Sequence, residues 1–253
     1  MARQLFILTG ASRGLGAAMA QLLLAPQNRL LCISRHGSER LAGQAAALGA
    51  RCEQWPLDLG RPVEAAARLQ SWLVHLEEAP ALEAATLINN AAALTRIGPL
   101  DDCEDGELSA ALRVSLEAPM LLCAAFLRAT RSWRASKRIL NISSGLGRRA
   151  MAAQAPYCAA KAGLDHLSRA LALDEAQRPD GARVVSLAPG VIDTDMQAHL
   201  RSADAAGFPD QANFIGWKQN GQLASSADAA ARVLAWLNRA DFGLNPVADV
   251  RDA

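Results

Sequence analysis

The chain has 253 residues, of which 51% are hydrophobic, 20% charged and only 4% aromatic. This length and composition suit helices packed on one buried parallel sheet and exclude a disordered protein. Its 26 Lys and Arg residues nearly balance its 25 Asp and Glu residues, so no strongly one-signed field favours nucleic acid or a membrane as partner. The five cysteines form no C-x-x-C pair, and no apolar run approaches the roughly 20 residues of a membrane span. We therefore expect a cytoplasmic protein.

Short apolar runs alternate with longer amphipathic helical patterns from the first residues onward. The runs that predict strands cover residues 4–9, 29–34, 51–56, 86–89, 138–143 and 183–187. Strands and helices that take turns imply parallel pairing with helices on both faces of the sheet. We expect an α/β fold of the Rossmann type, a doubly wound parallel sheet in three layers, formed by a single domain over residues 1–253.

Residues 194–221 break this alternation and gather three aromatic side chains, Phe208, Phe214 and Trp217. We expect this lid segment to cover the substrate. Its rings either form a wall of the substrate site, which we favour, or pin the lid segment to the body of the protein. A helix over 226–238, capped by Ser225 or Ser226, and a short strand near 246–250 follow.

A glycine-rich turn, TGASRGLG over residues 9–16, joins the first strand to the first helix. Gly10 permits a tight turn, and Gly14 has no Cβ to keep the backbone away from a pyrophosphate. Gly16 allows the helix to pack closely on the strand, and free N–H groups at the helix start face the phosphates. The position of the turn directly after the first strand indicates a dinucleotide site.

The second strand ends at Ser34-Arg35, without the acidic residue that an NAD site uses to hold the ribose 2′-hydroxyl. Two guanidinium groups, on Arg13 and Arg35, could instead bind a 2′-phosphate through charge-assisted hydrogen bonds. The pair favours NADPH over NADH. The alternative is that both arginines are only solvated surface charges.

Ser144 ends the fifth strand, and Tyr157 and Lys161 follow at i and i+4 of a helix predicted from about Ala155. This spacing places the phenol and the ammonium on one helical face. A phenol has an ordinary pKa of about 10, and a neighbouring cation favours its ionised form. Ser144 would hold a carbonyl oxygen beside the phenol, so the three residues indicate proton transfer to a substrate carbonyl.

The sequence resembles the short-chain dehydrogenase/reductase family along nearly its whole length. The matching pieces are TGASRGLG (9–16), Asp58-Leu59, NNAA (89–92), ISS (142–144), YCAAK (157–161) and Pro189-Gly190 with Thr194. The resemblance implies Ser144, Tyr157 and Lys161 as catalytic residues. It implies as cofactor contacts Gly10, Ser12, Arg13, Gly14, Leu15, Gly16, Arg35, Asp58, Leu59, Asn90, Tyr157, Lys161, Pro189, Ile192 and Thr194.

A narrower resemblance, to the sepiapterin reductase and bacterial benzil reductase branch, lies in residues 188–197, 217–223 and 248–252. It implies that Gly190 touches the substrate and that Asp249 takes the place of a carboxylate that anchors a pterin amino group. The alternative for Asp249 is a solvated carboxylate near the chain end. The implied substrate contacts are Ser144, Gly190, Met196, Trp217 and Asp249.

Ser115 stands where many family members have an asparagine that holds a proton-relaying water. Serine can also bind a water but lacks the paired donor and acceptor of an amide, so the sequence puts the relay in doubt. The four histidines show no metal-ligand spacing, and no metal is expected.

We expect an NADPH-dependent carbonyl reductase for a small ketone or diketone, with Tyr157 as the proton donor. One alternative is a non-catalytic NADP-binding sensor or interaction protein on the same fold, and another is an alcohol dehydrogenase that works in the oxidative direction. The resemblance also implies a homodimer or homotetramer, assembled through helices within 101–133 and 155–177.

Overall fold

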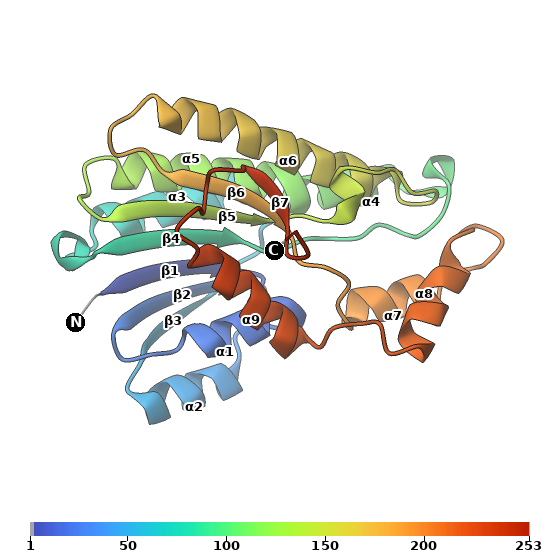
Figure 1. Ribbon diagram of the computed structural model, residues 1–253, viewed down its shortest axis with the longest axis horizontal. Helices are drawn as coiled ribbons and strands as arrows, with labels where there is room; N and C mark the ends of the chain where they lie inside the picture. Colours follow the sequence, from blue (N-terminus) through green and yellow to red (C-terminus); the bar gives the residue numbers. More distant parts are fainter. Residues whose placement is uncertain (1–2, 253) are drawn as a thin grey trace.

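A seven-stranded parallel sheet of order β3-β2-β1-β4-β5-β6-β7 forms the centre of the computed structural model (Figure 1). The structure describes residues 3–252, so the predicted domain bounds 1–253 include three residues, 1, 2 and 253, that lie outside the described residues. The strands are β1 (Gln4–Thr9), β2 (Asn28–Ser34), β3 (Arg51–Pro56), β4 (Ala84–Asn89), β5 (Ser136–Ile142), β6 (Arg183–Ala188) and β7 (Val247–Asp249).

Helices cover both faces of the sheet and complete three layers (Figure 1). One face packs against α1 (Gly14–Leu23), α2 (Glu39–Leu48) and α9 (Ser226–Leu237), and the other against α3 (Pro62–Val74), α5 (Ala118–Thr130) and α6 (Ala155–Ala176). Strands β1 and β4 are buried along nearly their whole length, as expected for a sheet covered on both sides. The predicted Rossmann-type fold is confirmed.

Main-chain pairing, rather than strand propensity, decides where two of the strands begin. β4 starts at Ala84, two residues before its predicted start, because Ala84 pairs with Gln4 of β1. On its other side Ala84 pairs with Ser136, so β5 also starts two residues early. Alanine and serine have weak strand propensity, and the two neighbouring strands supply the hydrogen bonds that hold them extended.

The run from Asp105 to Thr130 is a continuous helical stretch that passes the length and composition test for a membrane span. It consists of α4 (Asp105–Leu112), a π-helical turn (Arg113–Glu117) and α5, and by length and composition alone it could form a span. Half of its most apolar window is buried inside the protein. α5 contributes the fully buried Leu122 and Phe126 to the core, which is the environment of a core helix.

The order of the strands reverses between β1 and β4, and the position of this reversal indicates where a ligand binds. The chain runs outward from β1 to β3 on one side and from β4 to β7 on the other. Ligands of such sheets bind at the carboxyl ends of the strands beside this reversal. Here the backbone N–H of Asn90, directly after β4, donates to the Thr9 hydroxyl at the end of β1, at 2.9 Å.

Candidate active site

A cavity of about 1040 Å³ opens at the carboxyl ends of the strands. The predicted catalytic residues and the implied cofactor and substrate contacts all line this one cavity, whereas Phe208 of the predicted aromatic wall does not. Its lining includes the glycine-rich turn, Arg35 and the lid segment, which carries α7 (Asp195–Arg201) and α8 (Gln211–Gln219). The fold therefore brings together side chains that are up to about 240 residues apart in sequence.

In the glycine-rich turn, the backbone of Gly10 and the side chain of Asn90 lie too close to Gly16 for any side chain at that position. A Cβ there would lie 2.0 Å from the Gly10 carbonyl oxygen and 2.6 Å from the Asn90 side-chain nitrogen. Gly10 itself has φ of 69°, in the left-handed region. The Asn90 amide donates to the carbonyl oxygens of Thr9 and Gly10, at 3.0 and 3.2 Å, so this side chain holds the turn in shape.

The two arginines predicted for a 2′-phosphate have different surroundings. Arg13 donates to Asp195 of the lid segment at 3.1 Å, with both side chains largely exposed. Arg35 is exposed at the end of β2 and makes no ion pair with any described residue. The donor set suits a phosphate dianion, since at least one guanidinium is uncommitted and no carboxylate occupies position 34 or 35.

Ser144, Tyr157 and Lys161 meet at the wall of the cavity between β5 and α6. The Lys161 ammonium donates to the Ile142 carbonyl oxygen at 2.8 Å and lies 5.6 Å from the centre of the Tyr157 ring. Lys161 is only 2% exposed. The Ser144 hydroxyl accepts from the Leu146 N–H at 3.2 Å, which fixes the side chain at the start of a short 3-10 turn.

Burial moves the two titrating groups toward their uncharged forms. Desolvation raises the pKa of Tyr157 to about 12, against the opposing hydrogen bond from Ser144. Desolvation lowers the pKa of Lys161 to about 8, while the charge of Asp165 acts in the opposite direction. The Lys161 ammonium donates to a backbone carbonyl here, and burial is the largest cause of both shifts. At neutral pH the site therefore holds a phenol and an ammonium.

Comparison with known proteins agrees with this geometry. A family model described as short chain dehydrogenase matches residues 4–205. The chain belongs to the short-chain dehydrogenase family. It is 30% identical over 236 residues to a benzil reductase ((S)-benzoin forming) of Bacillus cereus, covering 93% of this chain and 94% of that protein. It is also 30% identical over 253 residues to the sepiapterin reductase of Bos taurus, covering 96% and 92%.

A solved structure is similar to this chain along nearly its whole length. A protein of Beutenbergia cavernae, described as an NAD(P)-dependent gluconate 5-dehydrogenase with bound NADP at low occupancy, superimposes with a TM-score of 0.81. The two are 26% identical, and the match covers 99% of this chain and 96% of that one. This short-chain dehydrogenase is accordingly an oxidoreductase of a family that acts on carbonyl and hydroxyl groups with nicotinamide cofactors.

The surroundings of Ser115, which the resemblance implies takes the place of an asparagine, show which groups its hydroxyl binds. Ser115 lies on the π-helical turn and is buried. Its hydroxyl accepts from the Ala93 N–H at 3.0 Å and donates to the Ala93 carbonyl oxygen at 3.3 Å. The Ser115 hydroxyl proton is thus already committed to a hydrogen bond with the backbone after β4.

The three aromatic side chains that the sequence grouped stay together, since the ring centres of Phe208 and Phe214 lie 5.4 Å apart, but only two of the three line the cavity. Phe214 and Trp217 line the cavity, and their ring centres lie 4.8 Å apart. Phe208 is 0% exposed and packs in a small cluster with Ile97 and Leu200. The predicted aromatic wall consists of Phe214 and Trp217, and Phe208 is corrected to a residue that pins the lid segment to the body.

Asp249 lies in the cavity at the end of β7, but its carboxylate is already paired. Arg251 donates to both of its oxygens, at 2.8 and 2.6 Å. The sequence analysis missed Arg251, although the spacing of two residues was a signal for such a pair. It also missed other residues that line the substrate end, which are Leu94, Leu146, Arg149, Met151, Gln154 and His199.

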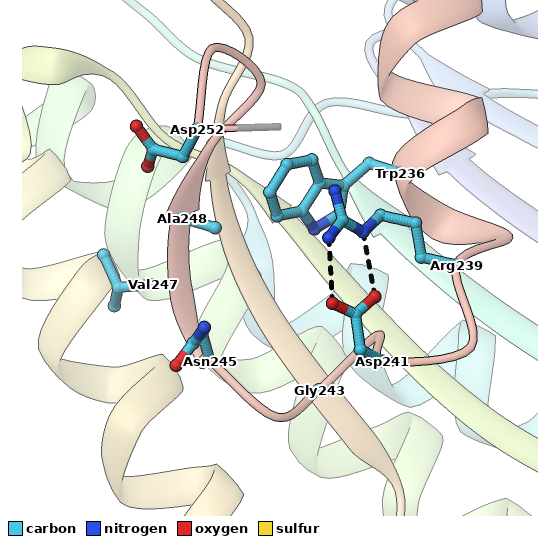
Figure 2. Close-up of a pocket in the computed structure, with 8 residues that line it drawn as sticks. All are labelled: Trp236, Arg239, Asp241, Gly243, Asn245, Val247, Ala248 and Asp252. Carbon is cyan, nitrogen blue, oxygen red and sulfur yellow. Dashed lines mark hydrogen bonds and ion pairs between the residues drawn. The ribbon is translucent and has the colours of Figure 1, made fainter.

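A second, smaller cavity of about 110 Å³ lies beside β7 and the end of α9 (Figure 2). Arg239 donates to both carboxylate oxygens of Asp241, at 2.8 and 2.9 Å, and its guanidinium lies 4.4 Å from the centre of the Trp236 ring. Arg239 and Asp241 thus satisfy each other, and the Asp252 carboxylate accepts from the Asp249 N–H at 3.1 Å. The larger cavity, which holds the titrating groups, is therefore the candidate active site.

Proposed function

We propose that this short-chain dehydrogenase is an NADPH-dependent carbonyl reductase for a small ketone or diketone. The observation that carries the proposal is the meeting of Ser144, Tyr157 and Lys161 at the wall of the cavity that the glycine-rich turn also lines. In this reduction Tyr157, which is protonated at neutral pH, is the proton donor.

Each residue of the site has a distinct role in the proposed reduction. Bound NADPH supplies the hydride. Tyr157 donates its phenolic proton to the carbonyl oxygen, and the Ser144 hydroxyl donates a hydrogen bond to the same oxygen, which orients the carbonyl. Lys161 supplies a positive charge beside the phenol and stabilises the phenolate that remains after proton transfer.

Preference for NADPH rests on the charges around the adenosine end. Arg35 has no carboxylate partner among the described residues, and its exposed guanidinium can reach solvent and ligand alike. Arg13 can approach the same 2′-phosphate by exchanging its partner, Asp195, for the ligand. The remaining cofactor contacts are those that the resemblance implies, and all of them line the cavity.

The substrate end of the cavity favours an apolar, aromatic ketone. Its lining includes Leu146, Met151, Met196, Phe214 and Trp217, which give broad apolar contact beside the polar side chains of Arg149, Gln154 and His199. The Bacillus cereus relative is described as a benzil reductase and the Bos taurus relative as a sepiapterin reductase. Because the Asp249 carboxylate is paired internally, a diketone of the benzil type suits the site better than an amino-bearing pterin.

Residues 194–221 act in this proposal as the substrate lid of a single catalytic domain. Assembly into a homodimer or homotetramer is proposed for α4, α5 and α6, which expose Leu112, Met120 and Leu173. Each of the five cysteines is free, which suits the proposed cytoplasmic location.

The test is NADPH consumption, followed by absorbance, with a panel of cyclic and aromatic ketones and diketones. We expect turnover of at least one aryl diketone by the unaltered protein and loss of turnover in Tyr157→Phe, with NADPH binding retained because the ring remains. Turnover in Tyr157→Phe would contradict the assigned proton donor. Absence of NADPH consumption with every ketone of the panel would contradict the function.

A further inference from the structure

A buried carboxylate, Asp165, lies one helical turn beyond Lys161 on α6 and is only 1% exposed. One of its oxygens accepts from the Ser143 hydroxyl at 2.5 Å and from the Ser186 hydroxyl at 2.6 Å. Its other oxygen accepts from the Arg148 guanidinium at 3.3 Å. A buried carboxylate is costly unless hydrogen bonds satisfy it, and here both oxygens are satisfied.

These bonds connect α6, which carries Tyr157 and Lys161, to the segment after β5 that carries Ser144. Ser143 directly follows β5 and is covalently joined to Ser144. Ser186 lies on β6, directly upstream of the turn at Pro189. Arg148 follows the 3-10 turn that Ser144 begins, and it also donates to the Ala248 carbonyl oxygen on β7 at 2.7 Å.

The backbone near Ser144 is shaped to admit this carboxylate. A Cβ at Gly147 would lie 2.7 Å from an Asp165 oxygen and 3.0 Å from the Lys161 carbonyl oxygen. Only glycine therefore allows the 3-10 turn to approach α6 this closely. The close approach places the Asp165 carboxylate between the strand end that carries Ser144 and the helix that carries Lys161.

Glu175 shows what a purely structural buried carboxylate looks like on the same helix. It is 3% exposed, and Arg131 donates to both of its oxygens at 2.8 Å, with a further bond from the Ala182 N–H. It lines no part of the catalytic cavity. Asp165 instead directs its bonds to residues at the catalytic end of the sheet.

We infer that Asp165 is a positioning residue of the active site, which aligns Ser144 with Tyr157 and Lys161 through its bonds to Ser143, Ser186 and Arg148. The inference rests on the proposed reduction. The electrostatic effect agrees with it, since the Asp165 charge raises the pKa of Lys161 and so partly opposes the lowering by burial.

Other titratable groups lie near Lys161, and their burial and position distinguish them from Asp165. On α6 the neighbour is the Tyr157 phenol. The loop after the 3-10 turn carries Arg148 and Arg149, β7 carries Asp249, which is paired with Arg251, and the π-helical turn carries the exposed Arg113 and Glu117. Among these, Asp165 alone is a fully buried carboxylate one helical turn from Lys161.

The experiment compares Asp165→Asn with Glu175→Gln, which removes the charge of the other buried carboxylate of α6. The chain has only three lysines, Lys137, Lys161 and Lys218, so ¹³Cε NMR of labelled lysine resolves the titration of Lys161 without any turnover. We expect Asp165→Asn to lower the pKa of Lys161 by about one unit, and Glu175→Gln to leave it unchanged.

Turnover gives the second measurement. We expect kcat of Asp165→Asn to fall about tenfold or more with KM for NADPH within about twofold, because misalignment affects the reacting groups more than the cofactor. The alkaline limb of its pH profile should move to lower pH. Glu175→Gln should lose thermal stability and keep its pH profile.

The inference is overturned if Asp165→Asn leaves the Lys161 titration and the alkaline limb where they are in the unaltered protein. It is also overturned if Glu175→Gln shifts both by the same amount. A protein that consumes no NADPH, yet shows the Lys161 shift in Asp165→Asn, would contradict the proposed function and leave the link between Asp165 and Lys161 standing.

Discussion

The guanidinium of Arg251 and the carboxylate of Asp249 form a two-point ion pair at the substrate end of the cavity, with contacts of 2.8 and 2.6 Å. Arg251 lies two residues beyond Asp249, and its hydrogen bonds hold the pKa of the carboxylate below its usual range. Arg148 lies farther away, at 3.9 Å. A ligand that bears an amino group must compete with Arg251 for this carboxylate.

Replacement of Arg251 should therefore change substrate preference. In Arg251→Ala the Asp249 carboxylate is free to accept from a ligand, and a hydrogen bond to a charged group contributes about 1.5 kcal/mol or more. We expect kcat/KM for an amino-bearing pterin ketone to rise about tenfold relative to that for benzil. The measurement is the ratio of the two kcat/KM values.

The matched control for this ratio is Arg239→Ala. Arg239 makes a similar two-point pair with Asp241, outside the large cavity (Figure 2). Its loss should leave the ratio unchanged. A ratio that stays constant in Arg251→Ala, or that rises equally in Arg239→Ala, would show that the pair does not control preference.

Tyr157 offers a direct measurement of its own titration, because it is the single tyrosine of the chain. Burial raises its pKa to about 12, so we expect the ¹³Cζ signal of the protein without cofactor to stay in the phenol position at about pH 9. Ser144→Ala should raise the pKa further, since the hydrogen bond from Ser144 lowers it.

A neighbouring variant should shift the same signal in the opposite direction. The Cys158 charge raises the pKa of Tyr157, so Cys158→Ser, which cannot ionise in this range, should lower it. A phenolate signal at neutral pH in the unaltered protein would contradict the assignment of Tyr157 as a protonated phenol that donates its proton.

Arg35→Ala should weaken NADPH binding and leave NADH binding nearly unchanged. Bonds from a guanidinium to a phosphate contribute about 1.5 to 3 kcal/mol, which corresponds to about 10- to 100-fold in KM for NADPH. The measurement is KM for each cofactor at fixed substrate concentration. Arg40→Ala, an exposed arginine on α2 that does not line the cavity, is the control. Equal losses for both cofactors would contradict binding of the 2′-phosphate by Arg35.

Gly16→Ala should lower the free energy of unfolding by about 1 to 3 kcal/mol, as overpacking does in a tightly packed site. Its Cβ would lie 2.0 Å from the Gly10 carbonyl oxygen. Gly43→Ala, in the middle of α2 with no atom within 4 Å of the new Cβ, should instead add about 0.5 to 1 kcal/mol. Denaturant unfolding measures both. A neutral Gly16→Ala would show that the first helix can shift away from β1.

Much of the fold could be read from short-range patterns. Apolar runs and glycine positions predicted the six long strands, and the two strands that begin early do so at Ala84 and Ser136, whose extended state depends on neighbouring strands. The spacing of Tyr157 and Lys161 predicted a shared helical face, and both side chains line the cavity. Such features are local, because helix period, strand alternation and turn chemistry act over a few residues.

Tertiary structure decided which of several plausible roles each remaining residue takes. Phe208 is buried and Trp217 lines the cavity, although the sequence placed them in one aromatic group. The pairing of Asp249, the use of the Ser115 hydroxyl by Ala93 and the bonds of Asp165 depend on partners that come from other elements or from the course of the backbone.

The sequence by itself therefore determined the order of strands and helices, because helix period and strand alternation are local, and it predicted the dinucleotide turn from its glycines. The three proposed catalytic residues remain a prediction from the spacing of Tyr157 and Lys161 and from the family resemblance. Only the folded chain decided how the buried charges pair and which rings face the cavity. Pair energies and burial depend on distances across the sheet, and these distances exist only after the strands have assembled.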